Sequence, residues 1–225
     1  MRRRALIWKS AAFAALFASG AGAQSLPPVT VLGDSILAWN RNEDRSIADA
    51  LSGILRRPVR DHAVSGAQLS GGAVFLREIR RQRVGPVPGW VVVDGGANDL
   101  MDACGCRSCA TDLSTLAAPD GQSGEVPQFV DELLSRGHRV IWVGYYGPSG
   151  QGGAFDICDD ELVELNRRLA RMAGTRPAVA FVPTRDLFGR GNADRYDTDQ
   201  IHPNAEGSQA IAARVAEVIL VTEGG

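Results

Sequence analysis

The sequence predicts a single α/β domain built around a parallel β-sheet. Short runs of β-branched residues alternate with helical patterns along the chain, which is typical of strands joined by crossover helices. Several of these runs are apolar throughout, as expected for strands that are buried on both faces. The 225 residues, of which 44% are hydrophobic and 22% charged, have an ordinary globular composition and suffice for one α/β core.

Five strands and five helices are expected. The strands are predicted over Val29–Leu32, Val59–Val64, Trp90–Asp94, Val140–Gly144 and Ala178–Val182. The helices are predicted over Ser46–Leu55, Ala73–Gln82, Pro127–Arg136, Asp159–Ala173 and Pro203–Leu220. A basic stretch is expected on a solvated helix face, and it consists of Arg77, Arg80, Arg81 and Arg83. The segment Asp102–Gly124, rich in Cys, Ser, Gly and Asp, is expected to be an ordered loop after the third strand.

Residues 1–23 have the layout of a secretory signal peptide. A basic start with three arginines and Lys9 precedes the apolar run Ser10–Ala18, and Ala21-Gly22-Ala23 forms a small-residue cleavage site before Gln24. The apolar run is about half of the ~20 residues that a membrane-spanning helix needs. We therefore expect a periplasmic or secreted domain over residues 24–225, with no membrane span once the signal is cleaved.

The expected mature chain is acidic and lacks lysine. Residues 1–23 contain four of the 24 basic residues and none of the 26 acidic ones, which leaves a formal charge of −6. Affinity for nucleic acid rests on basic patches, so this charge argues against a nucleic-acid partner. The chain also lacks a G-x-G-x-x-G motif and the lysine of a P-loop, which argues against a nucleotide-binding protein.

Four cysteines, Cys104, Cys106, Cys109 and Cys158, favour two disulfides in an exported chain. Three pairings are possible, and the sequence does not choose among them. A metal site is the alternative, because four thiolates could bind zinc, but oxidation competes with metal capture outside the cytosol. Three of the cysteines follow the third strand and the last follows the fourth. Disulfides are therefore expected to brace these loops into a rigid rim.

Polar and glycine clusters follow the predicted strands. The first strand ends in Gly33-Asp34-Ser35, the second in Ser65-Gly66 and the third in Gly95-Gly96-Ala97-Asn98-Asp99, while Asp199-Gln200-Ile201-His202 precedes the last helix. In an open α/β sheet, ligands bind outside the carboxyl ends of the strands. These clusters are therefore expected to meet at one edge of the sheet and to form the functional site.

Ser35, His202 and Asp199 are the residue types of a catalytic triad. A serine hydroxyl is a weak nucleophile that needs an adjacent base, itself oriented by a third group, and a three-residue separation lets one turn carry the base and the carboxylate. The backbone N–H groups of Ser35 and Gly66 and the side-chain amide of Asn98 are available donors for an oxyanion hole. Each motif alone is a common turn or helix cap, but together they indicate acyl transfer.

These segments resemble the blocks of the SGNH (GDSL) hydrolase family, in order and in position. The family motifs G-D-S, a block-two glycine, G-x-N-D and D-x-x-H match the clusters ending in Ser35, Gly66, Asp99 and His202, and the resemblance spans residues 29 to about 220. It implies a flavodoxin-like three-layer α/β/α sandwich with a five-stranded parallel sheet. It also implies Ser35 as nucleophile, His202 as base supported by Asp199, and an oxyanion hole of Ser35, Gly66 and Asn98, with no metal or organic cofactor.

The chain departs from the family pattern at two places. Ile36 replaces the leucine after the serine, and Asp61 and His62 stand where an asparagine often precedes the block-two glycine. No G-x-S-x-G motif offers a nucleophile elbow instead. The two remaining histidines, His62 and His138, are expected to be structural. Three aromatic residues near strand ends are expected either to line a substrate pocket or to pack, and they are Trp39, Tyr145 and Tyr146.

The expected function is that of an exported serine hydrolase that cleaves carboxylic esters through an acyl-enzyme, of the esterase, lipase or lysophospholipase type. Its partner would be a small-molecule ester, either a lipid or an acetylated glycan. The alternative within the family is a carbohydrate or peptidoglycan O-acetylesterase. A non-catalytic glycan-binding domain is a further alternative, which would lack a member of the triad.

Overall fold

Five parallel strands form the central sheet of the computed structural model, which describes residues 26–69, 77–188 and 194–224. The strands are β1 (Val29–Leu32), β2 (Val59–Asp61), β3 (Trp90–Val93), β4 (Arg139–Val143) and β5 (Val179–Val182), in the spatial order β2-β1-β3-β4-β5. This is the flavodoxin-like order, in which the chain reverses direction across the sheet between β1 and β3. The predicted fold class is confirmed.

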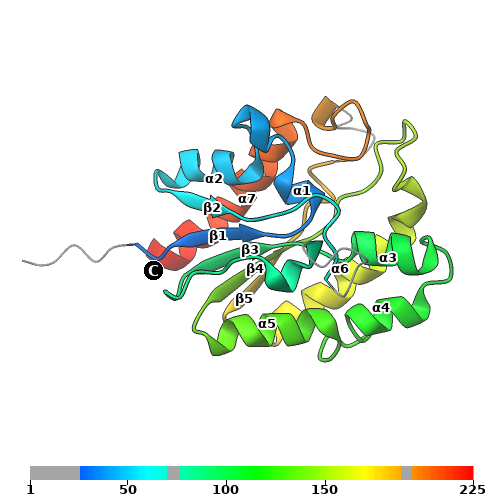
Figure 1. Cartoon of the computed structure of the whole chain (residues 1–225), viewed down its shortest axis with the longest axis horizontal. Coiled ribbons are helices and arrows are strands. Elements are labelled where there is room, and N and C mark those ends of the chain that lie inside the picture. The colour runs from blue at the N-terminus through cyan, green and yellow to red at the C-terminus, as the bar shows by residue number, and fades with distance from the viewer. Residues whose placement is uncertain (1–25, 70–76, 189–193, 225) are drawn as a thin grey trace, which may run out of the picture.

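Helices cover both faces of the sheet (Figure 1). They are α1 (Ser35–Ala38), α2 (Ile47–Leu55), α3 (Ala97–Cys104), α4 (Ala110–Leu116), α5 (Glu125–Ser135), α6 (Asp159–Gly174) and α7 (Ala205–Gly224), with short 3₁₀ helices η1 (Arg41–Glu43), η3 (Ile79–Arg81) and η4 (Asp156–Cys158). One layer holds α2 packed on α7, while α5 and α6 contact β4 and β5 on the other face. None of the helices in the described ranges is long and apolar enough to cross a bilayer.

The register of the sheet brings all carboxyl strand ends to one edge. Val29 pairs with Val59 on one side and with Trp90 on the other, and β4 and β5 continue the parallel ladder. All residues of β1 and β3 are buried, because helices cover them above and below. The loops that follow β1, β2 and β3 therefore start side by side.

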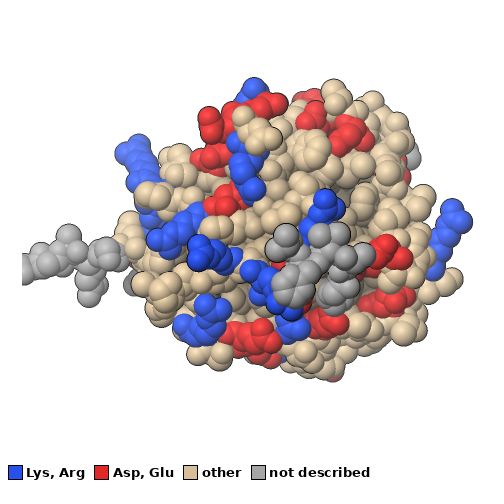
Figure 2. Space-filling model, viewed as in Figure 1, with Lys and Arg blue, Asp and Glu red and all other residues tan. Residues whose placement is uncertain are grey.

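Two of the predicted elements are wrong in part. Of the helix predicted over 73–82, residues 73–76 lie outside the described residues; Glu78 forms a β-bridge with Gln68, and Ile79–Arg81 forms the 3₁₀ helix η3 in place of an α-helix. The Gln82 side chain is instead hydrogen-bonded to the backbone of Gly33. The basic side chains there are not on a helix face, and Arg80 and Arg81 pair with Glu132 and Glu78. Figure 2 shows acidic and basic side chains side by side over this face of the molecule.

The segment Asp102–Gly124, predicted as a loop, contains the end of α3 and all of α4. Helix α4 is hard to detect because only Leu113 and Leu116 are buried in it, and its other residues are mostly small and polar. Ser114 and Thr115 donate to the carbonyl groups four residues earlier, so these side chains are accommodated within the helix.

Both expected disulfides are present, and the structure decides their pairing. Cys104 is bonded to Cys109 and Cys106 to Cys158. The second bridge joins the segment after β3 to η4, which follows β4 and leads into α6. Within the described ranges, no group of three or more His, Cys, Asp or Glu side chains is arranged to hold a metal ion.

Candidate active site

The turn after β1 places Ser35 at the carboxyl edge of the sheet. Asp34 caps α1 by accepting a hydrogen bond from the N–H of Ile36 at 2.9 Å, and Ser35 is the first residue of that helix. The Ser35 side chain lines a cavity at this edge and is partly exposed. The serine that the sequence predicts as the nucleophile is therefore accessible at the expected place.

The backbone before Ser35 is held from two sides. Gln82 accepts from the N–H of Gly33 at 2.6 Å and donates to its carbonyl at 2.7 Å. Asp94, which follows β3, accepts from the N–H of Asp34 at 2.8 Å. Gly33 has a φ of +137°, and a Cβ there would lie 1.8 Å from the Asp94 carboxylate, so this position requires glycine.

A buried network beneath Ser35 was not anticipated from the sequence. The Tyr145 hydroxyl donates to Asp34 at 2.6 Å and accepts from the N–H of Ala97 at 3.1 Å, which ties the loops after β1, β3 and β4 together. Burial raises the pKa of Asp34, although the bond from Tyr145 opposes this. Burial and the neighbouring Asp34 charge raise the pKa of Asp94 well above its usual range, so Asp94 is the carboxyl of this pair that more strongly favours its protonated form.

His202 and Asp199 form a close pair before α7. Asp199 Oδ2 lies 2.5 Å from His202 Nδ1, and Asp199 Oδ1 accepts from the N–H groups of Ile201 and His202 at 2.9 and 3.0 Å. Burial raises the pKa of Asp199, but these hydrogen bonds outweigh it and bring the pKa below the ordinary value. An ionised Asp199 thus fixes the ring and leaves Nε2 as the nitrogen that can accept a proton.

Trp39 brings the His202 loop over α1. Its indole stacks on the imidazole with ring centroids 3.7 Å apart and planes 6° from parallel, and Trp39 directly follows the helix that Ser35 begins. Both Ser35 and His202 are described, and no hydrogen bond joins the serine hydroxyl to the imidazole. Such bonds are often long in enzymes without substrate and tighten when substrate binds.

The remaining predicted site residues, Gly66 and Asn98, come from adjoining loops. Asn98 Nδ2 donates to the carbonyl of Ala67 at 3.0 Å, and Asp99 accepts from the N–H of Leu69 at 3.0 Å. These bonds hold the loop after β2 against the start of α3. The Asn98 amide has a second N–H that this bond leaves available. The arrangement thus brings two possible oxyanion donors to the same side of the sheet edge.

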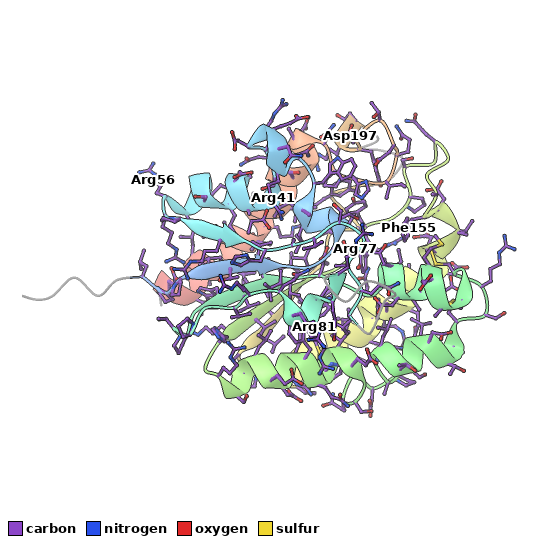
Figure 3. The ribbon with its side chains drawn as sticks, viewed as in Figure 1. Arg41, Arg56, Arg77, Arg81, Phe155 and Asp197 are labelled. Carbon is purple, nitrogen blue, oxygen red and sulfur yellow. A yellow bond between two sulfur atoms is a disulfide. The ribbon has the colours of Figure 1, made fainter. Side chains whose placement is uncertain are left out.

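An arginine stands beside the block-two glycine. Gly66 has a φ of +72°, and a Cβ there would lie 3.2 Å from Arg77 Nη1. Figure 3 shows Arg77 near the carboxyl ends of the strands, on the side where α3 begins. The sequence predicted Arg77 on a solvated helix face and did not predict that it lies close to the site. Its closeness to Gly66 depends on how two separate segments of the chain pack together.

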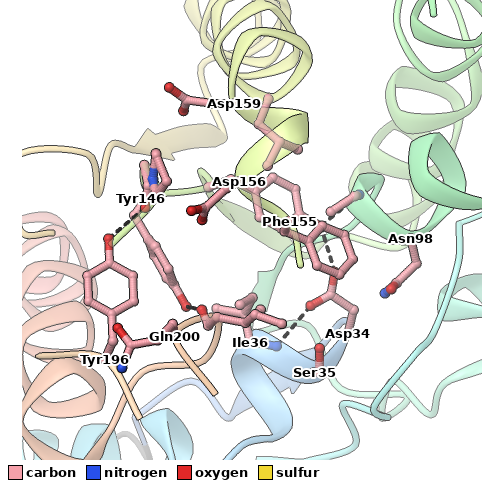
Figure 4. Close-up of a pocket in the computed structure, with 16 residues that line it drawn as sticks. Asp34, Ser35, Ile36, Asn98, Tyr146, Phe155, Asp156, Asp159, Tyr196 and Gln200 are labelled. Carbon is pink, nitrogen blue, oxygen red and sulfur yellow. Dashed lines mark hydrogen bonds between the residues drawn. The ribbon is translucent and has the colours of Figure 1, made fainter. Parts of the chain in front are cut away.

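A cavity of about 50 Å³ opens beside Ser35 (Figure 4). Its wall is largely apolar and aromatic, with Phe155 from the segment before η4. Besides Asp34, which accepts from Tyr145, two further carboxylates line it, those of Asp156 and Asp159. Asp159 pairs with Arg185 at 2.7 Å, whereas Asp156 forms no ion pair within the described ranges. The cavity therefore presents negative charge to a bound ligand.

The aromatic residues divide between the cavity and the histidine. Tyr145 and Tyr146 line the cavity, and the Tyr146 hydroxyl donates to the carbonyl of Ile201 at 2.7 Å. His62 does not line it. His138 is buried at the opposite edge of the sheet, where its Nδ1 accepts from the N–H of Gly89. Burial lowers the pKa of His138, which is consistent with the predicted structural role.

The sequence matches a known family model, and the structure is similar to solved structures with the same kind of fold. The model of the GDSL-like lipase/acylhydrolase family matches residues 31–210. The structure is similar to a lipase from a goat rumen metagenome, with a TM-score of 0.58 and 16% identity over 85% of this chain and 97% of that one. It is also similar to a member of the lipolytic protein G-D-S-L family from Veillonella parvula, with a TM-score of 0.60 and 15% identity over 85% and 97% of the two chains.

A third similar structure is a family two carbohydrate esterase from Clostridium thermocellum, in complex with cellohexaose. Its TM-score is 0.59 and its identity 18%, over 88% of this chain and 65% of the esterase. At these identities the likeness shows the fold alone. No curated protein matches the sequence.

Proposed function

The chain belongs to the GDSL-like lipase/acylhydrolase family, and we propose that it hydrolyses carboxylic esters through an acyl-enzyme on Ser35. In this proposal His202 is the general base and Asp199 orients it. The observation that carries the assignment is the 2.5 Å pairing of His202 with Asp199 beside the helix that Ser35 begins. A histidine whose Nδ1 is held by a carboxylate presents Nε2 to a nucleophile, as serine hydrolysis requires.

The reaction proceeds in two halves. His202 Nε2 takes the hydroxyl proton as Ser35 Oγ attacks the ester carbonyl carbon, and the resulting imidazolium is stabilised by Asp199. The tetrahedral intermediate expels the alcohol, which receives the proton from His202. Water then attacks the acyl-serine with the same base, which releases the carboxylic acid and restores the Ser35 hydroxyl.

The developing oxyanion would be bound by the backbone N–H groups of Ser35 and Gly66 and by the Asn98 amide. The hydrogen bond from Asn98 to Ala67, next to Gly66, supports this role because it holds two of the three donors together before substrate arrives. Arg77 beside Gly66 adds positive charge on this side.

The preferred substrates would carry short acyl groups. A cavity of about 50 Å³ has room for a few water-sized groups, so it encloses an acetyl group, whereas most of a long acyl chain would extend out of it into solvent. This favours a short-chain esterase over a lipase or lysophospholipase. An O-acetylesterase acting on carbohydrate or peptidoglycan is the second candidate, since its acyl group has this size.

Export of the protein is also proposed. The signal-like segment 1–23 lies outside the described residues, and support comes from the two disulfides, which persist in oxidising compartments. Mass spectrometry of the protein recovered from periplasm or medium should give a chain that begins at Gln24. A full-length cytosolic chain would contradict export.

The function is tested with nitrophenyl esters of increasing acyl length and with an acetylated glycan. The wild type should prefer acetyl and propionyl esters, and Ser35→Ala should lose turnover, because no other nucleophile replaces the hydroxyl. Ser135→Ala, which removes an exposed serine at the end of α5, away from the site, is the matched control and should keep wild-type activity. Asn98→Ala should lower kcat by about 10²-fold.

Wild-type turnover in Ser35→Ala would refute the mechanism. Equal rates on acetyl and long-chain esters would refute the acyl-size argument and leave the nucleophile in place. Release of acetate from the glycan at a higher kcat/KM than from nitrophenyl acetate would select the second candidate.

A further inference from the structure

Trp39 contacts the imidazole of His202 on a face that the proposed triad leaves unused. The two rings lie 3.7 Å apart at 6°, in a stacked arrangement. Trp39 does not line the cavity beside Ser35, and it faces a separate hollow together with Asp197 and Ser65. Its place against His202 is therefore not explained by substrate binding.

The indole is anchored at its edge by a carboxylate. Trp39 Nε1 donates to Asp197 Oδ2 at 2.7 Å, and this bond is the main cause that lowers the pKa of Asp197, so the acceptor is ionised. Asp197 in turn donates its N–H to the carbonyl of His202 at 2.8 Å, and its Oδ1 accepts from the N–H of Thr198 at 2.6 Å. Asp197 thus binds both the indole of Trp39 and the backbone of His202.

Asn40, which follows Trp39, also connects the segment after α1 to the segment around His202. Asn40 Nδ2 donates to the carbonyl of Pro203 at 2.8 Å and to the Ser208 hydroxyl at 3.3 Å. Trp39 and Asn40 follow the helix begun by Ser35, whereas Asp197, His202 and Pro203 lie more than 150 residues later. This pair of residues therefore holds the base in register with the nucleophile.

We infer that Trp39 is a positioning residue for His202, an inference that rests on the proposed function. The bond to Asp199 fixes one ring nitrogen but still allows the imidazole to rotate about that bond. The flat indole stacked on the ring opposes this rotation and so holds the plane of the imidazole, and with it the direction of Nε2. Its electron-rich face also attracts the imidazolium that forms when Ser35 is deprotonated. A cation over an aromatic face is stabilised by an amount equivalent to about 2- to 30-fold in rate.

The test compares Trp39→Leu, which removes the aromatic face, with Trp39→Phe, which keeps a face and loses the indole N–H. Trp39→Leu should lower kcat by about 10-fold with KM changed by less than about twofold, because the stacking acts on the base and not on substrate. Trp39→Phe should recover kcat to within about threefold of the wild type. A low-field proton NMR resonance from the His202–Asp199 bond should persist in Trp39→Phe and broaden or vanish in Trp39→Leu.

Trp90→Leu is the matched control. Trp90 is buried, whereas Trp39 is half-buried, and like Trp39 it donates from Nε1 to a carboxylate, that of Glu223 at 2.9 Å, but it lies at the opposite edge of the sheet. This variant should lower the melting temperature and leave kcat and the low-field resonance unchanged.

Several outcomes would overturn the inference. The first is a kcat of Trp39→Leu equal to that of the wild type. The second is a loss of kcat in Trp90→Leu as large as in Trp39→Leu. The third is a rise in the KM of Trp39→Leu with no change in its kcat. If Trp39→Leu fails to fold, loss of the resonance in a folded Trp39→Phe would also count against it. A wild type without esterase activity would refute the proposed function, and in that case the NMR comparison would still test the positioning of His202.

Discussion

Replacing Asp94 by asparagine should stabilise the protein, and more so as the pH rises. Asp94 is 1% exposed, its Oδ1 accepts from the N–H of Asp34, and its Oδ2 has no hydrogen-bond partner within the described ranges. Burial and the Asp34 charge hold its pKa well above the ordinary value of 3.8. Folding therefore keeps a proton on Asp94 at pH values where the unfolded chain releases it.

The sign of the pH dependence follows from this difference. A group whose pKa is raised by folding gives its full stability below its unfolded pKa and loses it as the pH rises toward its folded pKa. While the folded protein holds this proton, the free energy of unfolding falls by about 1.4 kcal/mol for each pH unit. Asp94→Asn has no proton to lose, and its amide can donate to Asp34 as the protonated acid would.

As the pH rises from 5 to 7, the variant should therefore gain stability relative to the wild type, by up to about 1.4 kcal/mol for each pH unit, which is equivalent to about 4 °C in melting temperature. The assay is urea unfolding followed by circular dichroism at pH 5, 6 and 7, with the disulfides intact. Asp102→Asn, which changes an exposed carboxylate on α3, is the control, and its free energy of unfolding should change with pH in the same way as that of the wild type. A difference between Asp94→Asn and wild type that does not change with pH would refute the reasoning.

Three further predictions follow from the structure. Replacing Cys106 and Cys158 by serine should lower the free energy of unfolding by about 4 kcal/mol in chemical denaturation, because this bridge closes a long loop. The loss should be about twice that for the Cys104–Cys109 bridge, which closes a short loop. Equal losses for the two bridges would contradict the loop-entropy argument. Gly33→Ala should abolish folding or activity, since its Cβ would collide with a buried carboxylate, whereas Gly53→Ala inside α2 meets no atom within 4 Å and should raise stability by about 0.5–1 kcal/mol in the same assay. Asp156→Asn should raise kcat/KM about 2- to 10-fold for an ester with a negatively charged alcohol and leave a neutral analogue unchanged, because it removes one unpaired charge from the cavity; equal effects on both esters would show that charge is not the cause.

Much of the fold and the outline of the site could be predicted because their signals are local. Apolar runs in the sequence predict β1 and β3. The runs are nearly uninterrupted because both faces of these strands are buried. Strand ends of a parallel sheet meet at one edge, so Gly33-Asp34-Ser35 and Gly96-Ala97-Asn98-Asp99 could be placed together from sequence alone. The Asp199–His202 pair was visible for the same reason, since three residues span one turn.

The features that escaped prediction depend on contacts between distant segments. The cysteine pattern predicted two disulfides, but only the packing of η4 against α3 brings Cys158 to Cys106. Trp39 carries no sequence signal for stacking on an imidazole 163 positions later, and Asp94 looks like an ordinary strand-end carboxylate until Asp34 and Tyr145 are folded around it. The sequence by itself therefore determined the architecture and the types of reactive groups, because periodicity and turns are encoded locally. Only the tertiary structure decided how those groups are oriented and charged, because burial and long-range hydrogen bonds exist only once the chain is folded.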